Sequence, residues 1–196
     1  MTAEPDKTAL RLRLRGERRR LAIEIPDAAE RAARRLPLSR FSRFRIVGVY
    51  NPQGSELDPK PLLEAILGLD PGFAQAALPV AVARDAPLRF RLWRPADVLV
   101  PDAAGIPSPP PAAPEVAPSL VIAPLLGFDR HGGRLGQGGG HYDRTLANLR
   151  RDRPVFVLGL AYAGQEVDAV PTDPHDQRLD AIVTETAFME VGGISR

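Results

Sequence analysis

One short stretch, residues 134–144, limits the folds open to this chain more than any other feature. It reads Arg-Leu-Gly-Gln-Gly-Gly-Gly-His-Tyr-Asp-Arg, follows an apolar run over residues 120–126 and precedes a helical pattern that begins near Tyr142. An apolar run, a glycine-rich turn and a helix in this order are typical of an α/β fold. The sequence therefore predicts a direct crossing from a buried strand to a helix.

The same stretch has the chemistry of an anion site. Glycines let the backbone approach a ligand closely and adopt positive φ, so successive N–H groups can converge on a phosphate. The start of the helix adds free amides and partial positive charge, and Arg134 and Arg144 could add charged hydrogen bonds. Asp143 would repel a phosphate unless a cation lay between them, and Mg²⁺ prefers one or two carboxylates together with phosphate oxygens.

The spacing of the glycines excludes two familiar phosphate motifs. No Gly-Lys-Ser or Gly-Lys-Thr follows at the Walker distance, and His141 stands where a Gly-x-Gly-x-x-Gly pattern begun at Gly136 needs its last glycine. By itself, the glycine run is equally consistent with a flexible surface turn between solvated charges.

Apolar strand patterns and helical patterns alternate along the rest of the chain. Helices are expected over residues 7–23, 28–36, 59–69 and 142–150, and strands over residues 45–50, 78–83, 88–93, 120–126, 155–161 and 181–184. The proline-rich residues 101–118 show no periodicity and are expected to form an irregular loop. This alternation predicts a single Rossmann-like α/β domain over residues 1–196, with a mostly parallel sheet and helices on both faces, in three layers.

Composition excludes several classes of protein. Cysteine is absent, which excludes disulfides, thiolate catalysis and cysteine-ligated zinc. No apolar run approaches the length of a membrane span, and the basic N-terminus lacks the apolar core of a secretory signal. We therefore expect a cytoplasmic protein without a membrane partner.

Arginines crowd the region between Arg11 and Arg45, although the formal net charge of the chain is only +2. Such a run could indicate a nucleic-acid surface. Acidic residues are interspersed, however, and no aromatic platform is interleaved with the arginines. A solvated basic helix face is the favoured interpretation.

Three positions outside the glycine segment are candidates for ligand contacts. Lys7 and Arg11 lie one helical turn apart and could grip a polyanion together, although ordinary surface charge is the simpler interpretation. Glu56 follows an expected strand, in a loop of the kind that binds ligands in open α/β sheets. Trp93 is expected in the core by default, with stacking on a flat heteroaromatic substrate as the alternative.

Several separated motifs coincide with those of one family. The chain resembles the 5-formyltetrahydrofolate cyclo-ligases, also called methenyltetrahydrofolate synthetases, over almost its whole length. The glycine segment is the most specific match. The other matches are a Lys-x-x-Leu-Arg start (Lys7, Leu10, Arg11), Glu56, Pro79, a Phe-x-x-Trp-x-Pro run (Phe90, Trp93, Pro95), Gly105 and Ile106, Pro109, Phe128 and Asp129, Gln165, Pro171, and His175 with Asp176.

The resemblance implies a single three-layer α/β domain and a particular reaction. Members of that family use ATP and Mg²⁺ to convert 5-formyltetrahydrofolate into 5,10-methenyltetrahydrofolate, ADP and phosphate. Because an N-formyl oxygen is a poor leaving group, the γ-phosphate would first activate it, and the nitrogen at position 10 would then attack the activated carbon. Such a phosphoryl transfer depends on alignment and charge neutralisation. The implied partners are the folate and ATP, with no nucleic acid and no membrane, and we expect a monomer.

The resemblance also implies roles for individual residues. Contacts with ATP are expected from Lys7, Arg11, Arg134, Leu135, Gly136, Gln137, Gly138, Gly139, Gly140, His141 and Tyr142, with Arg134 and Arg144 as the catalytic cations. Contacts with the folate are expected from Asn51, Glu56, Trp93, Gln137, Gly138, Gly139, Gly140 and His141, with Glu56 on the hydrogen-bond donor edge of the pterin. The expected ligands of Mg²⁺ are Asp143 and Asp176.

Three residues depart from the family pattern and keep other hypotheses open. His141 stands where many relatives carry tyrosine, Gln137 where an aromatic or basic residue is common, and Ser108 where glutamate is frequent. A catalytically weak regulator that binds a folate or phosphate ligand on the same fold is therefore the second hypothesis. An RNA-binding module, based on the N-terminal arginines, is the third, and it predicts a steep salt dependence of binding.

Overall fold

The computed structural model describes residues 6–192, which are built around one eight-stranded sheet. The strand order is β12-β11-β10-β7-β1-β2-β3-β6. The strands are β1 (Ile46–Gly48), β2 (Gln75–Val80), β3 (Arg89–Trp93), β6 (Glu115–Val116), β7 (Leu120–Ala123), β10 (Phe156–Leu160), β11 (Ala181–Val183) and β12 (Phe188–Glu190). The neighbours from β2 to β11 are parallel, and β3, β6 and β12 add antiparallel edges. The expected mostly parallel sheet is confirmed.

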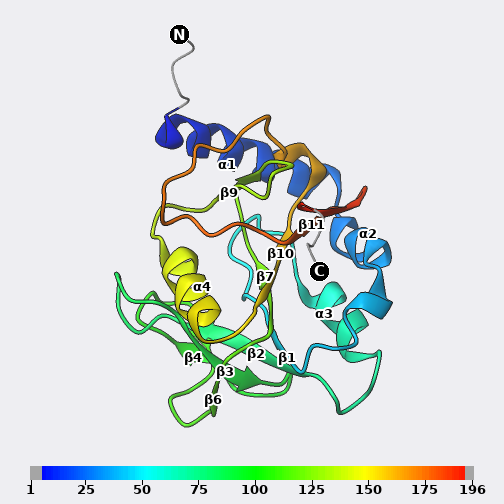
Figure 1. Cartoon of the computed structure of the whole chain (residues 1–196), viewed down its shortest axis with the longest axis vertical. Helices are drawn as coiled ribbons and strands as arrows, with labels where there is room; N and C mark the ends of the chain where they lie inside the picture. The colour runs from blue at the N-terminus through cyan, green and yellow to red at the C-terminus, as the bar shows by residue number, and fades with distance from the viewer. Residues whose placement is uncertain (1–5, 193–196) are drawn as a thin grey trace.

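Helices cover both faces of this sheet, as Figure 1 shows. They are α1 (Lys7–Glu24), α2 (Ala28–Arg35), α3 (Lys60–Leu67) and α4 (His141–Asp152). Side chains of a strand alternate between the two faces, so Leu120 packs in the core with α2 and α3, whereas Val121 packs in the core with α4. The three-layer arrangement predicted from the alternation is therefore confirmed for the described residues.

Helix α1 begins with a capped turn, and its first half packs on a short hairpin. The side chain of Asp6 accepts a hydrogen bond from the backbone N–H of Thr8 at 2.9 Å, which satisfies one free donor of the helix start. Leu10 and Leu14 then pack in a small core with Leu135 of the hairpin. This contact holds α1 against the glycine segment.

That hairpin corrects the predicted direct crossing from strand to helix. Strands β8 (Gly127–Phe128) and β9 (Arg134–Leu135) form it between β7 and the glycines. Its turn is organised by Asp129, whose buried carboxylate accepts backbone N–H groups of His131, Gly133 and Val170 at 2.8 to 2.9 Å. Since an apolar run alone carries no signal for a two-residue strand, the hairpin was not predictable from periodicity.

The proline-rich residues 101–118 are more ordered than expected. Strand β4 (Val100–Pro101) pairs with β5 (Pro107–Ser108), and β6 extends the main sheet. The carboxylate of Asp102 accepts the backbone N–H groups of Ala81, Ala104 and Ile106 at 2.8 to 3.0 Å and so fixes the loop between β4 and β5. The expectation of an irregular loop over residues 101–118 is therefore wrong where β4, β5 and β6 form. The sequence patterns also do not predict β12.

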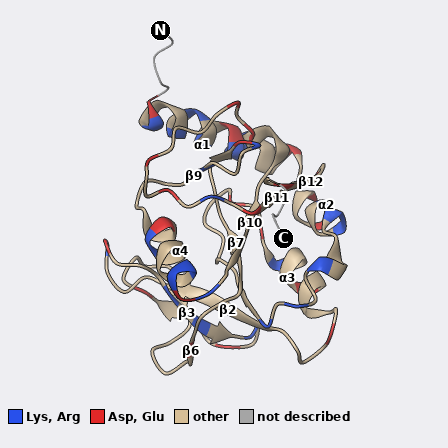
Figure 2. Ribbon diagram, in the orientation of Figure 1, with Lys and Arg blue, Asp and Glu red and all other residues tan. Residues whose placement is uncertain are grey.

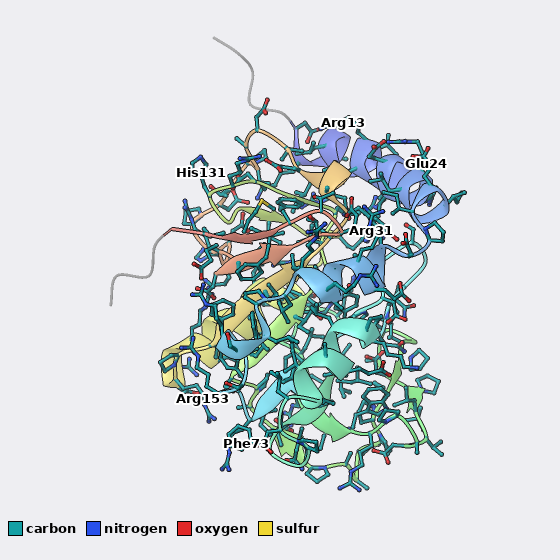
Figure 3. The ribbon with its side chains drawn as sticks, turned by 90° about the vertical axis from the view of Figure 1, so that its right-hand side faces the viewer. Arg13, Glu24, Arg31, Phe73, His131 and Arg153 are labelled. Atoms are coloured by element: carbon teal, nitrogen blue, oxygen red, sulfur yellow. The ribbon has the colours of Figure 1, made fainter. Side chains whose placement is uncertain are left out.

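Charges of both signs are mixed over the helices, as Figure 2 shows. In Figure 3, Arg13 and Glu24 lie on the outer surface of α1, in agreement with the expected solvated face. Other arginines of the same helix turn inward. Within residues 6–192, none of the helices combines the length and the hydrophobicity that crossing a bilayer requires.

Candidate active site

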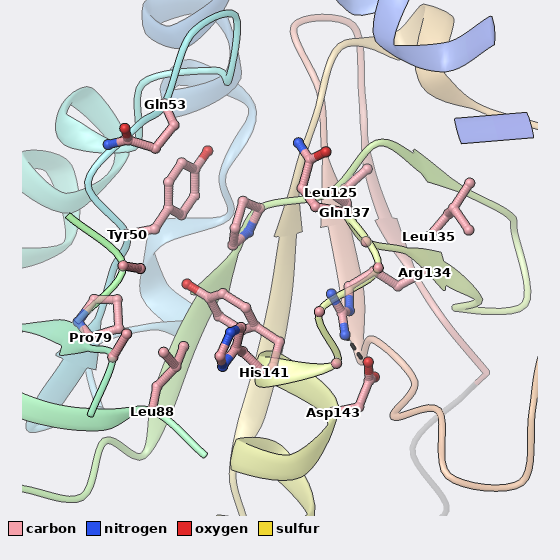
Figure 4. Close-up of a pocket in the computed structure, with 18 of the residues that line it drawn as sticks. Tyr50, Gln53, Pro79, Leu88, Leu125, Arg134, Leu135, Gln137, His141 and Asp143 are labelled. Carbon is pink, nitrogen blue, oxygen red and sulfur yellow. Dashed lines mark hydrogen bonds and ion pairs between the residues drawn. The ribbon is translucent and has the colours of Figure 1, made fainter. Parts of the chain in front are cut away.

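A cavity of about 530 Å³ opens at the carboxyl ends of the parallel strands. The chain leaves β1 through α3 on one face and leaves β7 through α4 on the other face. The two connections diverge, and open α/β sheets bind ligands in the crevice at such a switch point. Tyr50 and Glu56 after β1 and Leu125 after β7 all line the cavity, part of which is drawn in Figure 4.

Most of the expected site residues meet in this one cavity. The lining includes Lys7, Arg11, Asn51, Glu56, Asp176 and all residues of the stretch Arg134, Leu135, Gly136, Gln137, Gly138, Gly139, Gly140, His141, Tyr142 and Asp143. These residues come from α1, the loop after β1, β9, the start of α4 and the turn before β11. The structure therefore brings together segments that are up to 169 residues apart, as between Lys7 and Asp176.

The glycine segment passes from β9 to α4 through two left-handed positions. Gly138 has φ +108° and Gly140, the N-cap of α4, has φ +64°. A Cβ atom on Gly140 would lie 2.7 Å from Nη1 of Arg144 and would displace the end of that side chain, so glycine is favoured here mainly by its φ. Amides of the first helical turn have no partner within the helix, which makes this wall of the cavity suitable for an anion.

Arg134 is the most buried cation of the cavity wall. Its side chain is only 3% exposed, and its Nη2 donates to Oδ1 of Asp143 at 2.7 Å (dashed in Figure 4). Its guanidinium carbon lies 5.7 Å from the ring centroid of Tyr142. Its Nε is buried and has no hydrogen-bond partner within the described residues. A buried donor without a partner is costly, so Arg134 is suited to an anionic ligand.

Lys7 and Asp176 form the outer part of the same wall. Nζ of Lys7 lies 2.9 Å from the carboxylate of Asp176 and 2.5 Å from that of Asp173. Partial burial lowers the pKa of Lys7, but the bonds to the two carboxylates outweigh this effect and raise the pKa above its usual value. Partial burial works to raise the pKa of Asp176, yet the N–H of Asp173 and the ammonium of Lys7 hold this pKa below the usual range.

Asp143 is held by two donors. Its Oδ1 accepts Nη2 of Arg134 and also the backbone N–H of Gln177 at 3.0 Å. The turn over residues 173–177 thus contains one expected magnesium ligand, Asp176, and contacts the other, Asp143. Within residues 6–192, no cluster of three or more His, Cys, Asp or Glu side chains is placed to hold a metal. Any cation here would need other ligands in addition to these two carboxylates.

Glu56 forms the opposite end of the cavity. Its Oε1 lies 3.4 Å from Nη1 of Arg18, and its Oε2 accepts the backbone N–H of Gln53 at 3.0 Å. Asn51 lies beside it and donates its side-chain amide to the carbonyl of Pro107 at 3.0 Å, which fastens the proline-rich loop to this end. Burial, and next the charge of Glu56, raises the pKa of the Tyr142 phenol. Tyr142 is therefore a neutral hydroxyl in the wall between the two ends.

Two expected site residues do not line the cavity. Trp93 pairs with Ala76 at the amino end of β2, whereas the cavity lies at the carboxyl ends, and its ring packs on the core with α2 and α3. Trp93, expected to contact the folate, therefore lies outside this cavity. Arg144, expected as a catalytic cation, donates from Nη2 to the carbonyl of Gly139 at 2.7 Å, so it braces the glycine turn from outside the cavity lining.

Sequence reasoning missed Arg18, which is 5% exposed and contacts Glu56. The arginine run of the sequence predicts a solvated face, and Arg18 is a buried member of that run. The available signal was spacing: Lys7, Arg11 and Arg18 lie four and seven positions apart, which places them on one side of a helix. Arg15 also lies on this side and donates to Oε1 of Gln137 at 3.0 Å.

Fold and cavity together define a class, the open α/β proteins with a glycine-rich ligand cavity, lined by charges of both signs, at the switch point of a parallel sheet. Comparison with known proteins narrows this class. The chain belongs to the 5-formyltetrahydrofolate cyclo-ligase family, whose model matches residues 3–185. This is a family of enzymes.

Individual relatives agree with this assignment. The 5-formyltetrahydrofolate cyclo-ligase of Mycolicibacterium smegmatis is 30% identical over 186 residues, which cover 91% of this chain and 93% of that protein. The 5-formyltetrahydrofolate cyclo-ligase of Escherichia coli K12 is 34% identical over 149 residues, which cover 74% of this chain and 80% of that protein. The solution structure of Aquifex aeolicus 5,10-methenyltetrahydrofolate synthetase matches with a TM-score of 0.78 at 26% identity, over 97% of this chain and 95% of that chain.

Proposed function

We propose that this chain converts 5-formyltetrahydrofolate into 5,10-methenyltetrahydrofolate with ATP and Mg²⁺, releasing ADP and phosphate. The observation that carries the proposal is the polarity of a single cavity. One end, called the basic end below, has a glycine turn and the cations Lys7, Arg11 and Arg134, with Asp143 and Asp176 beside them as carboxylates for Mg²⁺, and the other end has the carboxylate of Glu56. A triphosphate suits the first end, and a heterocycle with N–H donors suits the second.

The basic end would hold the nucleotide phosphates. Backbone amides from Gly138 to the start of α4 can donate to phosphate oxygens, and the guanidinium of Arg134, which lines the cavity, can donate to the transferred group. Arg11 donates from Nε to the carbonyl of Gly136 at 3.0 Å, which keeps the glycine segment close to α1. Arg144 would act only by holding the turn.

The two carboxylates of this end fit Mg²⁺. This ion takes one or two carboxylates and completes its octahedron with water and phosphate oxygens. Asp143 and Asp176 are such a pair on one wall, and no third acidic ligand is required. Bound there, Mg²⁺ would neutralise charge on the phosphate oxygens during transfer.

The acidic end would hold the pterin. Glu56 can accept two neighbouring N–H groups of the pterin edge, and Asn51 would lie beside it. The neutral phenol of Tyr142 can donate to a polar group of the substrate. Gln137, the three glycines that follow it and His141 would lie where folate and nucleotide meet, and the Nδ1 of His141 is hydrogen-bonded to the carbonyl of Ala86 at 3.0 Å.

The proposed reaction balances without a protein nucleophile. The formyl oxygen attacks the γ-phosphorus, and the bond from this phosphorus to ADP breaks. The nitrogen at position 10 then attacks the formyl carbon and loses its proton, and phosphate leaves with the former formyl oxygen. The residues of the cavity align the groups and stabilise charge, which is the main requirement of phosphoryl transfer.

A single assay tests the proposal. Purified protein with 5-formyltetrahydrofolate, ATP and Mg²⁺ should produce the near-ultraviolet absorbance of the methenyl product, and omission of ATP should abolish it. Absence of this signal at high enzyme concentration, with folate binding intact, would favour the regulator instead. We also propose that the protein is a monomer and that it works in the cytoplasm.

A further inference from the structure

We propose that Arg18 is a positioning residue for substrate selection: it sets the affinity for the folate by orienting Glu56, without touching the ligand. This inference rests on the proposed function, because it assigns the acidic end of the cavity to the pterin. Arg18 does not line the cavity, yet its side chain lies directly behind the carboxylate that does.

Three contacts place the guanidinium of Arg18. Its Nε donates to the hydroxyl of Ser55 at 3.2 Å, and its Nη1 lies 3.4 Å from Oε1 of Glu56 and 3.3 Å from the carbonyl oxygen of Leu125. Ser55 and Glu56 belong to the loop after β1, and Leu125 belongs to the loop after β7. One cation on α1 thus connects the two loops that diverge at the switch point.

These contacts fix which oxygens of Glu56 remain for a ligand. An ionised carboxylate has about four lone-pair sites. Arg18 takes one on Oε1 and the N–H of Gln53 takes one on Oε2, so each oxygen keeps a site toward the cavity. Two adjacent acceptors in one plane match two adjacent N–H donors, such as those of a 2-amino-4-oxopyrimidine edge. Loss of Arg18 would let the carboxylate plane of Glu56 rotate.

Burial supports a positioning role over a solvated charge. The side chains of Arg18 and Glu56 are 6% and 9% exposed, so water cannot replace the guanidinium without rearrangement of the loops. The fork of an arginine can serve Ser55, Glu56 and Leu125 together, whereas the single ammonium of a lysine cannot keep this geometry. Arg19, the next residue, is exposed and provides a matched control.

The test compares binding of two ligands by calorimetry, with 5-formyltetrahydrofolate as one probe and ADP with Mg²⁺ as the other. Loss of a charged hydrogen bond that orients a ligand acceptor should weaken folate binding by roughly tenfold to a hundredfold in Arg18→Leu. Nucleotide binding should stay within about twofold. Arg18→Lys should give a smaller loss, and Arg19→Leu should change neither affinity.

A double-mutant cycle distinguishes action through Glu56 from general damage. In a Glu56→Gln background, Arg18→Leu should weaken folate binding by no more than about twofold further, because the carboxylate that it orients is already gone. Additive losses would overturn the proposal, as would unchanged folate affinity in Arg18→Leu or a parallel loss of nucleotide affinity. If Arg18→Leu does not fold, Arg18→Lys and its own cycle with Glu56→Gln decide in the same way.

The wild-type protein separates failure of this inference from failure of the proposed function. If it forms the methenyl product and Arg18→Leu binds folate normally, only the role of Arg18 is wrong. If the wild-type protein binds no folate, both proposals fall.

Discussion

Removal of the Arg134 guanidinium should abolish most of the turnover and leave most of the stability. Arg134→Met keeps the length of a side chain that is 3% exposed but removes the donors that face the cavity. Loss of one preorganised donor to developing charge typically lowers kcat by about 10² to 10³, or roughly 3 to 4 kcal/mol. We expect a loss of this order in kcat, measured by the ATP-dependent absorbance of the product.

The cost in stability should be much smaller. Asp143 loses its ion pair, but its carboxylate is 25% exposed and keeps the N–H of Gln177. The substitution also removes a buried Nε that has no partner in the described part of the chain. We therefore expect the free energy of unfolding to fall by about 1 to 3 kcal/mol, measured by urea denaturation.

The matched control is Arg130→Met, on the turn of the same hairpin. Arg130 is 76% exposed and pairs with Glu166 at the surface, where an ion pair contributes about 0 to 1 kcal/mol. The Arg130→Met variant should leave kcat unchanged. The reasoning about Arg134 would be refuted if Arg134→Met kept kcat within about tenfold, or if its loss of activity only followed its loss of folded protein.

Three further variants test other residues at the basic end of the cavity. Asp143→Asn should raise the Mg²⁺ concentration for half-maximal activity by at least about tenfold, because a neutral amide binds the ion less well; an unchanged requirement would remove Asp143 from the metal site. Gly140→Ala should lower stability by about 1 to 3 kcal/mol in thermal unfolding, because its φ of +64° and the nearby Arg144 both oppose a Cβ; an unchanged Tm would contradict this. The pKa of Asp176 is lowered in the fold, so its pairing with Lys7 stabilises the protein above about pH 4 and this contribution is lost as pH falls through the folded pKa. Asp176→Asn should therefore flatten the decline in stability below pH 4, and an unaltered decline would argue against the pair.

Periodicity predicted the layers of the fold because the strands near the centre of the sheet are strongly apolar. Val47, Leu120 and Leu158 are buried on one face and Val121 and Val157 on the other. Both faces are covered, so these strands form continuous apolar runs that stand out in the sequence. The bounds of α1 and α4 lie within two residues of the ranges 7–23 and 142–150 that helical periodicity predicts.

The short elements could not be predicted in the same way. Strands β4, β5, β8 and β9 have two residues each, and two residues carry no period. What fixes them is tertiary: Asp102 and Asp129 gather backbone N–H groups from neighbouring segments. An aspartate in a loop sequence does not reveal which amides it will accept.

Trp93 and Arg18 show that the sequence context of a residue does not reveal where its side chain lies in the fold. Trp93 belongs to a motif shared with the family, but its position in β3 places it at the amino end of β2. Arg18 was grouped with solvated arginines, although Arg13 and Arg19 on the same helix are exposed and Arg18 is buried. Which side of a helix faces the protein depends on the packing of Leu10 and Leu14, and the charges follow from it.

Under the proposed function, the charges of the basic end would exchange partners when the ligand binds. In this structure Lys7 pairs with Asp176, and Arg134 pairs with Asp143. Each cation is therefore already held beside a carboxylate by the fold, which reduces the cost of leaving cations in a poorly hydrated cavity. A triphosphate with Mg²⁺ brings anionic oxygens for the two cations and a cation for the two carboxylates. The triphosphate alone would leave the two carboxylates without a cation, and Mg²⁺ alone would leave the two cations without an anion. Tight binding of either ligand should therefore require the other.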